Sequence, residues 1–155
     1  MNVGIIVYTV SGHTLKAAQR LQVRLASDGH QVFMEHLELA GPAKVSNEEA
    51  DLKTSPILEN YDILVFCTPV RGGSPPPPVR RYLSQLVSLK GKRAACLVTH
   101  AFPLAWGANQ TVAALRAACE AKGALYLGMA AVHWFGFKHS HRLERAVREM
   151  CRLFE

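Results

Sequence analysis

The chain has 155 residues, of which 49% are apolar and 19% charged, and its 18 basic and 12 acidic side chains give a net charge of +6. This length and composition are typical of one globular domain, spanning residues 1–155, and no apolar run is long enough to cross a membrane. Because no aromatic residues alternate with a basic stripe, nucleic acid is not expected as a partner.

The cysteines are far apart in the sequence and form no Cys-x-x-Cys pair. They are Cys67, Cys96, Cys119 and Cys151, and each lies in an apolar segment. We therefore expect buried, free thiols and no metal site. Free thiols, together with the lack of a basic and then apolar leader, predict a cytoplasmic protein.

Apolar strands alternate with amphipathic helices along the whole chain. The sequence predicts strands at 2–8, 31–37, 61–67, 93–99 and 124–132. It predicts helices at 13–27, 47–52, 108–122 and 139–154, and another that is entered through the prolines at 75–78, with Val79, Tyr82, Leu83 and Leu86 on one face.

Continuous apolar strands separated by such helices indicate a parallel sheet that is covered on both faces. The predicted fold class is α/β, a three-layer doubly wound sandwich with a five-stranded parallel sheet in the order 2-1-3-4-5. Strand 31–37 alternates poorly, as expected near a sheet edge. Ligands of such sheets bind beyond the carboxyl ends of the strands, so the loops after strands one, three and four are the candidate site.

The first of these loops is rich in hydroxyl groups and opens a helix. It comprises Thr9, Val10, Ser11, Gly12, His13 and Thr14. Hydroxyl groups, backbone N–H groups and the helix dipole together favour a bound phosphate. The alternative is an ordinary helix cap made by Ser11 or Thr14. The pattern Thr-x-Ser-Gly-x-Thr resembles the loop with which flavodoxins hold the phosphate of flavin mononucleotide (FMN).

The two later loops are similar to the flavodoxin segments that border the flavin ring. The candidate cofactor-binding residues after strand three are Thr68, Pro69, Val70, Arg71, Gly72 and Gly73. Those after strand four are Thr99, His100, Phe102, Trp106 and Gly107. The resemblance implies that Phe102 or Trp106 stacks on the ring, although plain packing onto the sheet is the alternative.

Several features depart from the flavodoxin pattern. The loop after strand three has no aromatic residue, so one face of the ring is expected to be open. A cation at Arg71 would stabilise a negative charge on the reduced ring, unless it is simply a solvated loop residue. His13 is expected either to contact the phosphate or to be exposed. The segment 133–141, which is rich in histidine and aromatic residues, either packs the end of strand five on the last helix or forms a surface for a partner or substrate. The net charge of +6 is unusual because flavodoxins are generally acidic.

The resemblance implies a redox flavoprotein that holds FMN noncovalently and needs no catalytic side chain. One alternative is an electron carrier that docks to a redox partner protein. Another is an oxidoreductase that takes hydride from a reduced nicotinamide and passes electrons to a small flat acceptor such as a quinone. A third is a binding module of the same fold without redox activity. The oligomeric state stays open.

Overall fold

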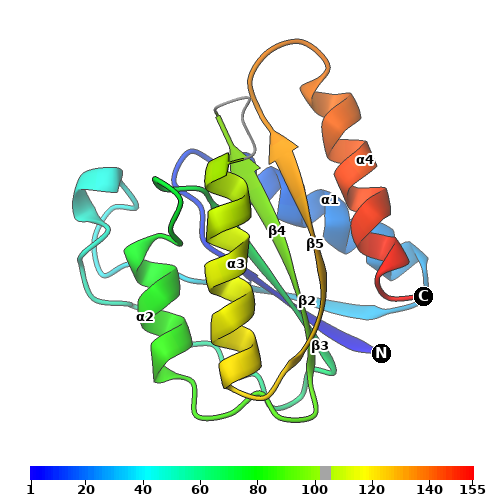
Figure 1. The fold of residues 1–155 in the computed structure, drawn as a ribbon, viewed down its shortest axis with the longest axis horizontal. Coiled ribbons are helices and arrows are strands. Elements are labelled where there is room, and N and C mark those ends of the chain that lie inside the picture. Colours follow the sequence, from blue (N-terminus) through cyan, green and yellow to red (C-terminus); the bar gives the residue numbers. More distant parts are fainter. Residues whose placement is uncertain (102–105) are drawn as a thin grey trace.

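A five-stranded parallel sheet, in the order β2-β1-β3-β4-β5, forms the middle layer of the molecule (Figure 1). The computed structural model describes residues 1–101 and 106–155, and for Trp106 it describes the backbone only. The fold class, the strand order and the edge position of the second strand are thus as predicted from the sequence.

The strands are β1 (Asn2–Val7), β2 (Gln31–His36), β3 (Ile63–Pro69), β4 (Arg93–His100) and β5 (Leu125–His133). The α-helices are α1 (His13–Ser27), α2 (Pro77–Gln85), α3 (Trp106–Ala121) and α4 (His139–Arg152), and a 3-10 helix, η1, spans Val45–Asn47.

The predicted strands and long helices begin and end within two residues of the observed ones. Two of the differences have identifiable reasons. The third strand was predicted two residues too early, because Pro69 still pairs with Thr99 while Tyr61 lies before the strand. The aromatic ring of Tyr61 instead packs over Gly4, where an added Cβ would lie 2.5 Å from it. The helix predicted at 47–52 is wrong, since only the short turn of η1 forms there.

The sheet separates two hydrophobic clusters. One lies between the sheet and helices α2 and α3, and includes Phe66, Val79 and Leu115. The other lies between the sheet and helices α1 and α4, and includes Val65 and Leu21. All four cysteines are buried and free, as predicted. Within the described residues no helix is long and apolar enough to cross a membrane.

Because all strands are parallel, their carboxyl ends lie at the same edge of the sheet, and those of β4 and β5 are seen at the top of Figure 1. The loops after β1, β3, β4 and β5 leave the sheet at this edge. The strand order reverses at β1, because β2 is added on one side of it and β3, β4 and β5 on the other. This edge therefore brings the predicted site loops together.

Candidate functional site

Helix α1 begins without a side-chain cap. Its N-cap residue, Gly12, has a φ of 90°, no side chain in the described part of the molecule bonds to the cap, and the first turn holds no acidic residue. The Gly12 N–H donates to the Thr9 hydroxyl oxygen over 3.1 Å, which closes the turn. The first N–H groups of a helix have no intrahelical acceptor, so this terminus can receive an anion. The alternative that Ser11 or Thr14 caps the helix is wrong.

Thr14 anchors this turn to the sheet. Its side chain is 2% exposed, and its hydroxyl shares a 2.8 Å hydrogen bond with the hydroxyl of Thr99 at the end of β4. The bond joins the first turn of α1 to the end of β4. Thr14 therefore lies behind the loop, while Thr99 lines the cavity described below.

The loop after β3 continues the sheet and then turns sharply. The Val70 N–H donates to the Thr99 carbonyl oxygen over 2.9 Å, and the Ser74 N–H donates to the Arg71 carbonyl oxygen over 3.1 Å. Gly73 has a φ of 82°, and a Cβ there would collide with the side chain of Gln110 in α3. The glycines thus let this loop pack closely against the start of α3.

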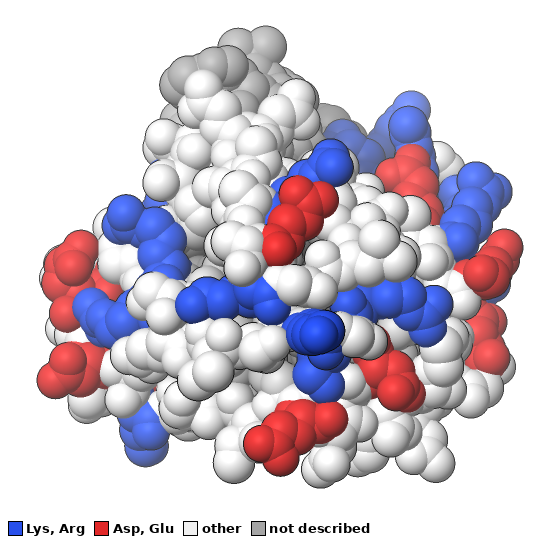
Figure 2. Space-filling view, turned by 60° about the horizontal axis from the view of Figure 1, so that its bottom comes forward, with Lys and Arg blue, Asp and Glu red and all other residues white. Residues whose placement is uncertain are grey.

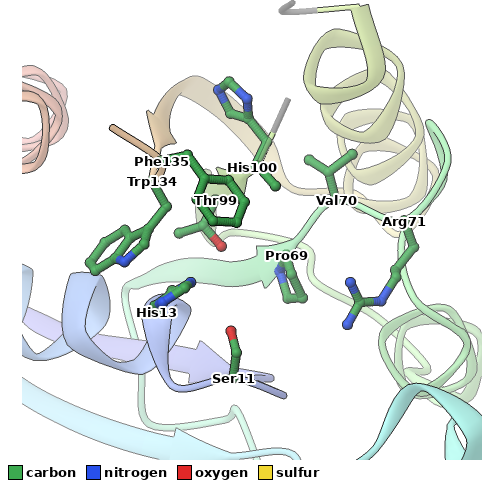
Figure 3. A pocket seen from close by; sticks show the side chains of 10 residues that line it. Ser11, His13, Pro69, Val70, Arg71, Thr99, His100, Trp134 and Phe135 are labelled. Carbon is green, nitrogen blue, oxygen red and sulfur yellow. The ribbon is translucent and has the colours of Figure 1, made fainter. Parts of the chain in front are cut away.

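Arg71 points its guanidinium group toward the cavity from this loop (Figure 3). Its Nε donates to Oε1 of Glu48 over 3.0 Å, and Glu48, from the segment after β2, is only 6% exposed. The Tyr8 hydroxyl lies 3.4 Å from the same oxygen atom. Burial, with the charge of Glu48, raises the pKa of Tyr8 to about 12. The Arg71 cation is therefore compensated by a buried carboxylate, which the sequence did not reveal.

A cavity of about 100 Å³ lies where these loops meet (Figure 3). Seven predicted site residues line it: Ser11, His13, Pro69, Val70, Arg71, Thr99 and His100. This volume is below the roughly 300–1,000 Å³ of most small-molecule sites.

The other predicted site residues do not line the cavity or cannot be placed. Thr68 is buried, and its hydroxyl donates to the Pro69 carbonyl oxygen over 3.1 Å. Others lie beside the cavity residues in the chain without lining the cavity: Thr9, Val10, Gly12, Gly72 and Gly73 in the loops, Thr14 in the first turn of α1 and Gly107 in the first turn of α3. Phe102 and the side chain of Trp106 lie outside the described residues.

Two aromatic residues that the prediction left out, Trp134 and Phe135, complete the cavity wall. The imidazole ring of His13 stacks on Trp134 with centroids 4.6 Å apart, and His139 lies near the same indole at 5.6 Å. His13 is thus half-buried, so the expectation of an exposed side chain is wrong. The signal was available, because these residues directly follow β5 at the edge where the other loops converge.

Arg142, in the first turns of α4, fixes the loop that carries these aromatic residues. Its Nε donates to the His133 carbonyl oxygen over 2.8 Å, Nη1 to that of Phe137 over 3.2 Å, and Nη2 to that of Phe135 over 2.5 Å. The Trp134 N–H donates to the His100 carbonyl oxygen over 2.9 Å. The side of the cavity formed by Trp134 and Phe135 is therefore held in place by side-chain and backbone hydrogen bonds.

No protein-family model and no curated protein matches the sequence. Solved structures do match over nearly the whole chain. Flavodoxin 1 from Bacillus cereus, in its oxidised form, matches with a TM-score of 0.70 and 16% identity, covering 99% of this chain and 97% of that one.

A flavodoxin from the TIGR4 strain of Streptococcus pneumoniae matches with a TM-score of 0.66 and 18% identity, over 98% of this chain and 99% of that one. A Fusobacterium nucleatum flavodoxin bound to flavin mononucleotide matches with a TM-score of 0.66 and 14% identity, over 97% of both chains. Together with the strand order and the site at the carboxyl edge, these matches show that this chain has the flavodoxin-like fold.

Proposed function

We propose that this chain is a redox protein that binds FMN noncovalently at the carboxyl edge of its sheet and exchanges electrons with a partner protein. The observation that carries the proposal is the uncapped start of α1, with Gly12 in the left-handed conformation, at the point where the strand order reverses. Such a terminus suits a phosphate. The Fusobacterium nucleatum flavodoxin, which is similar to this chain in structure, is bound to FMN.

The residues of the site suit the different parts of this ligand. The N–H groups of the first turn of α1 would receive the phosphate, and the hydrogen bond between Thr14 and Thr99 would keep that turn in register with the sheet. Val70, Arg71 and Phe135 also line the cavity and would border the flavin ring. When bound, the flavin ring supplies the redox chemistry, so the side chains need only bind, orient and tune it.

The direct test is the absorbance spectrum of the purified protein during addition of FMN. Binding would perturb the flavin bands and quench the flavin fluorescence with a saturable, one-to-one response. A spectrum identical to that of free FMN at high protein concentration would reject this function and favour a binding module without flavin.

The buried, free thiols agree with a reducing compartment such as the cytoplasm.

A second candidate function is an oxidoreductase that uses a reduced nicotinamide and a quinone-like acceptor. It is favoured by the loop after β3, which offers Pro69, Val70 and Arg71 to the cavity but no aromatic ring. A ring face left open on this side would admit a flat molecule. Steady-state turnover of NADPH with a soluble quinone would support the enzyme, whereas bound FMN without turnover would support the carrier.

A further inference from the structure

The loop between β5 and α4 exposes two phenylalanine rings to solvent, and one of them lines the cavity. Phe135 is 61% exposed and lines the cavity, and Phe137 is 96% exposed. Large apolar side chains are unfavourable in water, and exposed apolar surface beside a site often marks a contact with another molecule.

Hydrogen bonds and ring contacts within the loop hold the two phenylalanines in this exposed position. Arg142 binds the carbonyl oxygens of both phenylalanines and of His133, while Trp134 is turned inward against His13 and His139. Lys138, at the end of the loop, has a φ of 69° and is the one non-glycine residue with a positive φ in the described ranges 1–101 and 106–155. Side chains other than glycine or asparagine rarely adopt this conformation, so the surrounding bonds hold the loop in a specific shape.

The residues around the two rings are basic. Residues 133–143 include no aspartate or glutamate, and exposed Lys138, His139 and His141 follow Phe137 directly. The next carboxylates along α4 already have partners, since Glu144 pairs with Arg20 and Glu149 pairs with Arg145. The surface beside the cavity therefore combines apolar rings with positive charge.

We infer that Phe135, Phe137 and Lys138 form a docking surface for an acidic redox protein, whose negative charges face this basic segment and whose apolar contact covers the two rings. This inference rests on the proposed redox function. Charge complementarity selects the partner and speeds the encounter, whereas the buried rings supply most of the affinity. Docking here places the partner at the rim of the cavity.

The test measures binding of cytochrome b5, a small acidic haem protein, at low ionic strength by isothermal titration calorimetry. We expect saturable binding to the wild type that weakens as salt is added, because salt screens the attraction between exposed charges. Cytochrome c, a basic haem protein, is not expected to bind. No binding of cytochrome b5, or preferential binding of cytochrome c, would overturn the inference.

Phe137→Ala is the decisive variant, and Val87→Ala is its matched control. Val87 is 95% exposed and precedes β4, at the opposite edge of the sheet. We expect Phe137→Ala to raise the Kd for cytochrome b5 about tenfold and Val87→Ala to leave it unchanged. Equal Kd values for the two variants would overturn the inference, and so would a dimer of this chain that Phe137→Ala dissociates.

Lys138→Gly tests the charge separately. Glycine accepts a positive φ without strain, so this variant removes the cation while keeping the shape of the loop. We expect weaker binding of cytochrome b5 and a smaller salt dependence, and an unchanged Kd would count against the inference. The flavin absorbance of the same samples reports on FMN binding independently, so a failure of docking is distinguishable from a failure of the proposed function.

Discussion

The hydroxyl group of Thr14 joins the start of α1 to the end of β4 at the candidate site. Thr14→Val keeps the shape of the side chain but removes its hydrogen bond to Thr99. We expect a loss of about 1 kcal/mol in the free energy of unfolding, measured by urea denaturation, since a net intramolecular hydrogen bond contributes about that much. The affinity for FMN should fall more than the affinity for riboflavin, because riboflavin has no phosphate.

Thr111→Val is the matched control for this change. Thr111 is also fully buried, but its hydroxyl oxygen has no hydrogen-bond partner within the described residues. Removing it should leave stability unchanged or slightly increased and should not alter flavin affinity. Equal effects of the two valine substitutions on FMN binding would show that the hydroxyl bond does not organise the phosphate loop.

Arg71 and Glu48 are expected to shift the redox potential of a bound flavin in opposite directions. Arg71→Ala removes a cation from the cavity wall and should make the potential more negative, whereas Glu48→Gln leaves that cation uncompensated and should make it less negative. Each shift should be on the order of 30 mV, equivalent to about 1.4 kcal/mol for a two-electron couple. A redox titration measures this, with Arg24→Ala, at the far end of α1, as the control.

At the scale of elements, periodic patterns predicted the sheet well because β1, β3 and β4 are largely apolar and the helices have one apolar face. The order of β2, β1 and β3 came instead from the fit to the flavodoxin-like fold, and the place of the candidate site came from the rule that ligands bind beyond the carboxyl ends of such strands. The pairing of Arg71 with Glu48 was not predictable, because Glu48 lies in an irregular segment whose path depends on long-range contacts. Trp134, in contrast, could have been included in the predicted site, because it directly follows β5 at the edge where the other site loops converge.

The junction of β5 and α4 depends on a single side chain. Arg142→Lys keeps a positive charge but cannot reproduce three diverging hydrogen bonds to carbonyl oxygens. We expect a loss of about 2 kcal/mol in stability and faster amide hydrogen exchange in residues 134–138.

Arg145→Lys is the control for the Arg142 substitution. Arg145 lies on the same helix, but its side chain is largely exposed and pairs only with Glu149 among the described residues. Exposed pairs contribute little, so this change should be nearly neutral. If both lysine variants unfold at the same urea concentration, the three hydrogen bonds made by Arg142 do not stabilise the loop.

At the scale of the whole molecule, the positive charge is not gathered at the candidate site alone. In Figure 2, which brings the lower end of the molecule forward, basic side chains form a row across the surface, with acidic side chains above and below it. Lys90, Lys92 and Lys122 lie in the connections at this end, before β4 and β5. Lys92 there bonds to the carbonyl oxygens of Glu59 and Tyr61, so part of this charge is structural.

The four tyrosines make the whole fold sensitive to high pH. Burial raises the pKa of Tyr8 and Tyr61 to about 12 and raises the pKa values of Tyr82 and Tyr126 as well. Below pH 10 each tyrosine is protonated in both states, so this contribution to stability is complete. Between about pH 10 and 12 only the unfolded chain loses the proton, so stability should fall, by about 2–3 kcal/mol for Tyr8 alone.

Ultraviolet absorbance of tyrosinate, recorded with circular dichroism, checks this expectation. Ionisation should accompany loss of the folded signal above pH 10. Tyrosines that ionise with a midpoint near 10 while the fold is intact would show that these rings are not protected by burial.

The central claim is that the phosphate of FMN is held by the open start of α1, and comparing FMN with riboflavin tests it most directly. Both ligands carry the same ring, so the ratio of their Kd values isolates the phosphate. We predict that FMN binds about a hundredfold more tightly, because hydrogen bonds to a charged group each contribute about 1.5–3 kcal/mol. Equal Kd values for FMN and riboflavin would contradict the account.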